Sequence, residues 1–274
     1  MISKFKAAAE QVMLSTQNQI YIAPSQELSV YVAKYTISFV CNNIGPATIT
    51  LIPDASGCLI FTYDGSSFTS LLWGTTTKTF IVKNDMNDYP MKLFIELLPS
   101  GLFFLTGIKQ TEFTNLQMPL GQVNSRLHSL VSDAFESAEN LNDFIEKLNR
   151  ILLSYIQSRT LPQALFSALE NIKRYKGCLS VKELAEMEFY SDRHLNRLFN
   201  DYLGTNIKTF SNIVRIHHVL QRMSCGKHLP ADIAQVSGFY DQAHFIHTFK
   251  AICGTTPKKY FANMSEFYNE PCKL

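Results

Sequence analysis

One stretch of the chain, SDRHLNRLFN at residues 191–200, has side chains suited to reading DNA bases. Apolar residues recur along one side of the helix that it would form: Leu195, Leu198, Phe199 and Tyr202. Polar residues recur at the same spacing on the opposite side: Arg193, Asn196, Arg197 and Asn200. A helix fits the major groove, where Arg can donate two hydrogen bonds to guanine and Asn can pair with adenine. A solvated polar face has the same pattern, so the surrounding elements decide between the two interpretations.

A second stretch, GFYDQAHFIHTFK at residues 238–250, matches the first when the two are laid 50 residues apart. The match pairs aromatic and histidine residues: Phe189 with Phe239, Tyr190 with Tyr240, His194 with His244 and Phe199 with Phe249. Each copy predicts a short helix, a tight turn and a longer helix followed by a glycine. Because a duplicated helix-turn-helix has few common uses besides binding DNA, we interpret the polar face of the first stretch as a working surface.

The longer helix of the second copy is expected at about 241–252. Its core side is predicted to hold Phe245, Thr248, Phe249 and Ile252, and its other side Ala243, Ile246, His247 and Lys250. Further helices of this region are predicted at about 163–175, 207–223, 231–236 and 257–264. Ser180 is expected to cap another helix, with Glu183 at the capping-box spacing, and Ser191 to cap the helix of the first copy.

The stretch from about 163 to 264 resembles the DNA-binding domain of AraC/XylS-type bacterial transcription regulators. The matching segments are LAEMEFYSDRHLNRLF, NIVRIHHVL, IAQVSGFYDQAHFIHTFK and GTTPKKY. The resemblance implies two helix-turn-helix units, joined by a long helix, that enter successive major grooves about 34 Å apart. By position it implies base reading by Arg193, Asn196, Arg197, Gln242, Ala243, Ile246 and His247. Contacts to the DNA backbone are expected from Ser191, Asn200, Lys208, Lys250, Lys258 and Lys259.

Two departures from the family pattern affect these expectations. The usual glycine of the first turn is replaced by Phe189, whereas the second turn keeps Gly238, so the first turn is expected to differ slightly in geometry. The frequent Ser-Arg pair of the second recognition helix is replaced by Ile246 and His247, which removes a strong donor. We therefore expect Arg193, Asn196 and Arg197 to set most of the sequence preference, and the second helix to contribute Gln242, shape and backbone anchoring.

Residues 19 to about 118 predict an antiparallel β-sandwich or small barrel. Short runs rich in Ile, Val, Thr, Phe and Tyr are broken by turn residues, as in LSVYVAKYTISFV, GCLIFTY, KTFIVK and GLFFLTG. The region more weakly resembles the N-terminal domain of a subset of the same regulators, which implies effector binding, dimerisation or both. An effector pocket could be lined by aromatic residues, namely Tyr31, Tyr35, Phe61, Phe103 and Phe104, although core packing explains the same residues.

Between these parts, amphipathic helices are predicted from the apolar spacing of residues 123–135 and 141–156. They could cap the core of the front domain or form a dimer seam. The chain is thus predicted to be α+β, with an antiparallel β-rich front domain at 1–118, linker helices at 119–160 and an all-α domain of two helix-turn-helix units, joined by a long helix, at 161–266.

Composition and cysteine spacing bear on other classes of protein. From residue 161 onward there are 14 Lys and Arg against 10 Asp and Glu, a mild positive excess that suits an anionic partner. The six cysteines form no Cys-x-x-Cys pair, so structural zinc is not expected, and no metal or cofactor is predicted. The chain contains no phosphate-binding glycine loop, Gly-x-Ser-x-Gly or His-Glu-x-x-His. An enzyme such as a DNA-repair alkyl acceptor is the disfavoured alternative, because Cys41 and Cys58 have no histidine in their region.

The sequence therefore predicts a non-enzymatic regulator of transcription that binds double-stranded promoter DNA. A homodimer and a small-molecule effector are expected, and RNA polymerase is a partner implied by the resemblance. A front domain that serves only protein–protein contacts is the alternative. No membrane segment or secretory signal is expected, which predicts a cytoplasmic protein.

Overall fold

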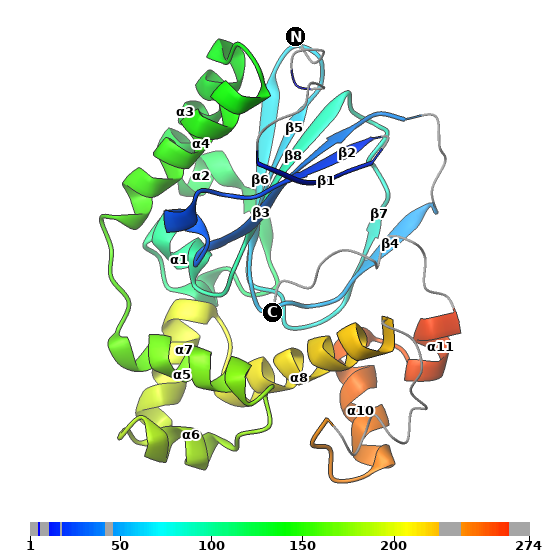
Figure 1. Cartoon of the computed structure of the whole chain (residues 1–274), viewed down its shortest axis with the longest axis vertical. Helices are drawn as coiled ribbons and strands as arrows, with labels where there is room; N and C mark the ends of the chain where they lie inside the picture. The colour runs from blue at the N-terminus through cyan, green and yellow to red at the C-terminus, as the bar shows by residue number, and fades with distance from the viewer. Residues whose placement is uncertain (1–4, 6–10, 17, 42–45, 225–236, 263–274) are drawn as a thin grey trace.

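The computed structural model describes residue 5 and residues 11–16, 18–41, 46–224 and 237–262 of the chain. A β-rich part with four helices occupies one end of the molecule, and a helical part occupies the other (Figure 1). The short helix expected at 231–236 lies outside the described residues, as do Cys225 and Cys272. The α+β class predicted from the sequence is confirmed.

Seven antiparallel strands form the main sheet. Across the sheet their order is β1 (Val12–Ser15), β2 (Gln19–Ile22), β3 (Val32–Phe39), β8 (Met91–Leu97), β5 (Cys58–Tyr63), β6 (Phe68–Trp73) and β9 (Gln117–Pro119). A second sheet pairs β4 (Thr48–Leu51) with β7 (Phe80–Lys83) and extends toward the helical part (Figure 1). Short 3-10 turns lie at Gln26–Leu28 (η2) and Gln110–Glu112 (η3).

The central strands of the main sheet, β2, β3 and β8, are buried on both faces, but with different chemistry. One face contributes the apolar residues of the core, among them Tyr35, Phe61 and Ile95, which are fully buried. The other face carries buried polar groups, where the Thr36 hydroxyl donates to Glu96 Oε1 at 2.8 Å and Lys34 Nζ lies 3.6 Å from the same oxygen. This pairing keeps buried charges compensated, as burial requires.

The segment GLFFLTG is a helix, α1 (Gly101–Thr106), so the strand predicted there is wrong. A short apolar run fits a buried helix as well as a buried strand, and its periodicity cannot separate them. Here the chain reverses just before the run, with the Gly101 N–H donating to the Leu98 carbonyl at 2.9 Å. Gly107, at φ 71°, ends the helix in the left-handed conformation that glycine favours.

Three more helices complete the front part: α2 (Leu120–Val123), α3 (Ser125–Ser137) and α4 (Leu141–Ile156). The apolar residues of α3 and α4 belong to the same core as the sheet, where the Phe5 ring stacks on Phe135 and meets Phe144 edge-on. The apolar faces of α3 and α4 therefore cover the core of the front part, which is one of the two roles predicted for these helices.

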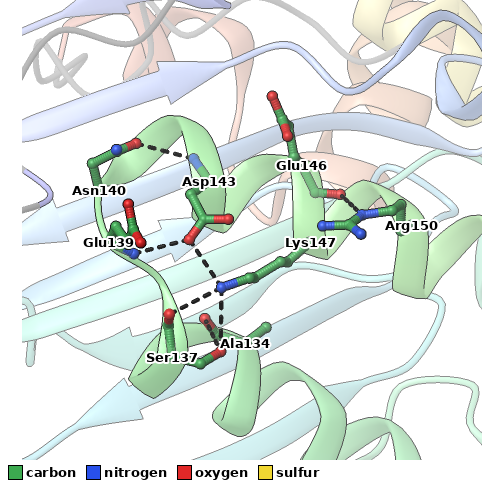
Figure 2. Close-up of polar contacts among 8 residues, drawn as sticks. All are labelled: Ala134, Ser137, Glu139, Asn140, Asp143, Glu146, Lys147 and Arg150. Carbon is green, nitrogen blue, oxygen red and sulfur yellow. Dashed lines mark hydrogen bonds and ion pairs between the residues drawn. The ribbon is translucent and has the colours of Figure 1, made fainter.

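The turn between α3 and α4 is fixed by polar contacts (Figure 2). Asn140 caps α4 by accepting a hydrogen bond from the Asp143 N–H at 3.1 Å. Asp143 Oδ2 in turn accepts from the Lys147 ammonium and from the Glu139 N–H, both at 2.9 Å. These contacts hold the pKa of the Asp143 carboxyl below its ordinary value, with the Lys147 hydrogen bond as the largest cause.

The helical part has its own apolar core. Its helices are α5 (Gln163–Arg174), α6 (Val181–Met187), α7 (Asp192–Leu203), α8 (Ile207–Ser224), α10 (Gln242–Cys253) and α11 (Pro257–Ala262). These bounds agree closely with the predicted helices of the described region. The predicted capping box is present, since the Ser180 hydroxyl accepts from the Glu183 N–H and Glu183 Oε2 accepts from the Ser180 N–H. Ala55, from the loop between β4 and β5, also packs into this core.

Candidate nucleic-acid interface

Helix α7 separates the predicted core face from the predicted reading face of the first unit. Leu195, Leu198 and Phe199 are buried, whereas Arg193 and Arg197 are exposed. The Ser191 hydroxyl caps the helix by accepting from the His194 N–H at 3.3 Å, so the cap predicted at this residue is confirmed. Both arginines lie on the exposed face of this 12-residue helix, where Arg197 Nη2 lies 3.3 Å from His194 Nδ1.

Asn196, also predicted to read a base, is half-buried, and its side chain is occupied within the protein. Its Oδ1 accepts from the Ile207 N–H at 3.1 Å, at the first residue of α8, and its Nδ2 donates to the Asp192 carbonyl at 2.9 Å. Asn200 is half-buried too and donates to the Asn196 carbonyl at 2.9 Å. The two arginines are thus exposed, whereas the Asn196 amide links α7 to α8.

Helix α10 has the two faces expected of the second unit. Phe245, Thr248, Phe249 and Ile252 are buried, as predicted. The residues predicted to read bases are exposed together on the opposite side: Gln242, Ala243, Ile246 and His247. Asp241 caps this helix, its Oδ1 accepting from the His244 N–H at 2.7 Å, in the same way that Ser191 caps α7.

In each unit, one residue of the turn adopts the left-handed backbone conformation. The number of residues between it and the cap of the following helix differs between the two units. Phe189 has a φ of 59° and Gly238 a φ of 71°, so the phenylalanine takes the left-handed conformation of the missing glycine. It precedes the cap of α7 by two residues, whereas Gly238 precedes the cap of α10 by three. Phe189 is 94% exposed and Phe239 only 6%, so these two residues, paired at the 50-residue offset, have different surroundings at the turn.

Arg215 of α8 connects the two units, a role that the sequence interpretation missed. Its Nε donates to the Gly177 carbonyl at 3.2 Å, its Nη1 donates to the Gly238 carbonyl at 3.5 Å, and its guanidinium lies 5.1 Å from the Phe239 ring centre. A single arginine inside the apolar-periodic segment NIVRIHHVL is the signal that could have indicated it. The lysines predicted to contact phosphates are exposed: Lys208, Lys250, Lys258 and Lys259.

Comparison with known proteins identifies the helical part. Residues 184–263 match a family model described as a helix-turn-helix domain. This region is a helix-turn-helix domain of the AraC type.

The AraC-type domain carries the similarity to curated proteins. An uncharacterized HTH-type transcriptional regulator of Staphylococcus aureus is 38% identical over 82 residues, which cover 30% of this chain and 11% of that protein. The HTH-type transcriptional regulator GlxA of Rhizobium meliloti is 30% identical over 95 residues, covering 34% of this chain and 29% of GlxA. The chain thus spans only a minor part of these relatives. Among solved structures, ToxT from Vibrio cholerae is 14% identical with a TM-score of 0.40, over 91% of this chain and 97% of ToxT.

The front part contacts the AraC-type domain at the carboxyl ends of α7 and α10. The Thr114 hydroxyl donates to the Gly204 carbonyl, just after α7, at 2.7 Å. The Thr79 hydroxyl donates to the Ile252 carbonyl of α10 at 2.6 Å. Lys109 Nζ lies 3.0 Å from Asp201 Oδ1. Figure 1 shows the corresponding arrangement, with α1 near α7 and the β4–β7 sheet near α10.

The aromatic residues predicted for an effector pocket lie in packed surroundings. Tyr35 and Phe61 are fully buried in the front core, and burial raises the pKa of Tyr35, whose hydroxyl donates to Asn149 Oδ1 at 2.8 Å. Phe103 packs edge-on against Tyr202 of α7, with ring centres 4.6 Å apart. Tyr31 and Phe104 pack against each other at 4.3 Å. The structure therefore places these rings in the core and between the two parts.

The described residues show neither a metal site nor a membrane-spanning helix. Within them, no group of three or more His, Cys, Asp or Glu side chains is arranged to hold a metal ion. None of their helices is long and apolar enough to cross a membrane. Cys178 and Cys253 are free thiols, and burial raises the pKa of Cys253.

Proposed function

We propose that the chain is a sequence-specific DNA-binding regulator of transcription. The observation that supports this most is the duplicated helix-turn-helix, in which α7 and α10 both bury one face and expose residues able to contact a major groove. Arg193 and Arg197 are the exposed donors of the first helix, and we assign them the main share of base readout. The second helix contributes Gln242 and His247 as polar contacts and Ala243 and Ile246 as apolar contacts to thymine methyl groups.

Backbone anchoring is proposed for the exposed lysines around the two helices, together with the amino-terminal ends of α7 and α10. Each lysine that neutralises a phosphate releases condensed counterions. Its replacement by alanine should therefore reduce the slope of log affinity against log salt by about one. This applies separately to Lys208, Lys250, Lys258 and Lys259.

The test of the proposal is footprinting of the chain on DNA selected from a random pool. Two protected major grooves on one face of the duplex, about one helical turn apart, are expected. Arg193→Ala and Arg197→Ala should each cost about 1–3 kcal/mol of binding and relax preference at one or two bases. Arg150→Ala, which removes an exposed arginine from α4 of the front part, is the matched control. Unchanged preference in both variants would remove the two arginines from the reading surface.

For the front part we propose a sensing role, a dimerisation role or both. A regulator of this kind would act in the cytoplasm, on promoter DNA and together with RNA polymerase. Sedimentation of the chain with and without DNA tests the homodimer. A thermal-shift screen with metabolites tests sensing, because a ligand that binds only the native state raises the melting temperature.

A further inference from the structure

Three side chains form a row that leads from the first turn onto α7: Tyr190, His194 and Arg197. The Tyr190 ring stacks on the His194 ring, with ring centres 4.8 Å apart and planes 12° from parallel. His194 Nδ1 lies 3.3 Å from Arg197 Nη2, because residues three apart lie on one face of a helix. One of the two arginines assigned to base reading is therefore held by a neighbour within the protein.

The hydrogen-bond roles in this contact follow from the chemistry of arginine. A guanidinium group has five N–H donors and no acceptor, so Nδ1 of His194 accepts and the proton of the imidazole is carried by Nε2. Only one donor of Arg197 is used in this way. The others suffice for the two-bond contact that arginine makes with guanine O6 and N7. His194 thus restricts the guanidinium group without occupying it.

Arg193, the other exposed arginine of α7, has no such support. Within the described residues, no hydrogen bond or ion pair holds its guanidinium group. A long side chain that moves freely in the unbound protein loses that freedom when it binds, whereas a side chain already held in place loses less. Of the two arginines, Arg197 is therefore the one prepared for a directed contact.

The equivalent histidine of the second unit has a different partner. His244 Nδ1 accepts a hydrogen bond from the Tyr240 N–H at 3.4 Å, and its ring meets the Phe239 ring edge-on at 5.6 Å. His244 therefore contacts the turn before α10 instead of a side chain of the reading face. This difference makes His244 a matched control for His194.

From these contacts we propose that His194 is a positioning residue for Arg197, with Tyr190 supporting the imidazole ring. The Nδ1 acceptor orients the guanidinium group toward one base and so raises the preference for that base. The proposal rests on the DNA-binding function proposed above. Loss of the acceptor should lower the preference at the base pair read by Arg197 about two- to tenfold, which corresponds to the cost of ordering one long side chain.

The first experiment measures this preference by fluorescence anisotropy of the full chain. It is the ratio of the Kd values for the selected duplex and for a duplex changed at the base pair that Arg197→Ala no longer distinguishes. His194→Phe keeps an aromatic ring against Tyr190 but lacks the acceptor, so the ratio should fall about two- to tenfold. His194→Asn should retain most of the preference, because asparagine Oδ1 and histidine Nδ1 are both acceptors bonded to Cγ. His244→Phe should leave the ratio unchanged.

Further variants test whether His194 acts through Arg197. In a chain that already carries Arg197→Ala, His194→Phe should lower the ratio no further. Tyr190→Leu should change the ratio in the same direction as His194→Phe, whereas Tyr190→Phe keeps the stacked ring and should not. Circular dichroism confirms that each variant is folded.

The contact itself is tested without DNA, in the full chain labelled with 15N-arginine. The guanidinium signals of Arg197 are assigned by their loss in Arg197→Ala. A hydrogen bond to His194 should slow the rotation of the guanidinium group, and His194→Phe should make the rotation faster.

The proposal is overturned when His194→Phe keeps the wild-type preference, when His194→Asn loses as much preference as His194→Phe, or when the guanidinium group rotates equally fast with and without His194. Failure of the proposed DNA-binding function looks different. In that case the rotation is slowed in the wild-type chain, but no duplex is preferred over another. The contact then exists without a reading role, and the proposal falls together with the function.

Discussion

Replacement of Asn196 by alanine distinguishes a structural from a DNA-reading role of this residue. In the structure its amide accepts from the N–H of Ile207, the fully buried first residue of α8, and donates to the Asp192 carbonyl. Asn196→Ala would leave the Ile207 N–H without this partner in a buried setting. An unsatisfied buried donor costs about 1–3 kcal/mol, and loss of a side-chain cap about 1 kcal/mol, so a loss of about 2 kcal/mol in unfolding free energy is expected.

The measurement is equilibrium unfolding in urea, read by circular dichroism, together with DNA binding. The urea midpoint should fall without a change in the slope of free energy against denaturant. DNA affinity should fall for all sequences alike, because α7 and α8 are less well fixed. Arg197→Ala is the matched comparison: it lies one residue away and is exposed, so it should leave the unfolding free energy within about 0.5 kcal/mol of wild type.

Asn196→Ala that unfolds like the wild-type chain, yet loses preference at a single base, would refute this reasoning. It would mean that the Asn196 amide leaves α8 when DNA is bound and pairs with a base, as the sequence-based assignment expected.

Three further predictions concern the local structure. Phe189→Gly should be neutral or raise the free energy of unfolding in urea by up to about 1 kcal/mol. The Phe189 side chain is 94% exposed, and its φ of 59° is a conformation that favours glycine. Destabilisation by this substitution would show that the ring packs against the protein in solution. Ser180→Ala should cost about 1 kcal/mol through loss of the capping box, with Ser158→Ala as an exposed serine control. Asp143 has a lowered pKa in the folded chain, so its contribution to stability is complete above its ordinary pKa of 3.8 and is lost as pH falls through the lower folded value. Asp143→Asn should therefore flatten the acid limb of the stability–pH curve, and an unchanged limb would contradict the role of Lys147.

Much of the helical part could be predicted from local sequence signals. Apolar residues at helical spacing and the caps at Ser180 and Ser191 depend only on nearby residues, which is why the helices and their buried faces were predicted well. The strand predicted at GLFFLTG failed because an apolar run of that length has no periodicity that excludes a buried helix. At the first turn, a left-handed Phe189 could not be read from the sequence, because the glycine that normally indicates this conformation is absent.

The candidate site was less predictable, because the roles of its residues depend on contacts between distant segments. Asn196 and Arg197 have the same polar spacing in the sequence, but only tertiary structure shows that one amide faces α8 while the guanidinium faces solvent. The contact of the Thr79 hydroxyl with the Ile252 carbonyl joins distant residues, and no local pattern indicates it. The sequence thus identifies a face of a helix, whereas the fold assigns a role to each residue on it.

On the proposed function, the contacts of the front part affect how α7 and α10 can fit one DNA duplex. Helix α8, about 27 Å long from its 18 residues, follows the first unit and packs against α10 of the second. Arg215 adds a second link by donating to the carbonyls of Gly177 and Gly238, which precede and follow α8 in the chain. Thr114 and Thr79 add a third, because both belong to the front part and hold the ends of α7 and α10. On the proposed function, a ligand that moves these two threonines relative to each other would alter the spacing of α7 and α10. The fit of the two helices to successive major grooves would then change, although the ligand contacts neither reading face.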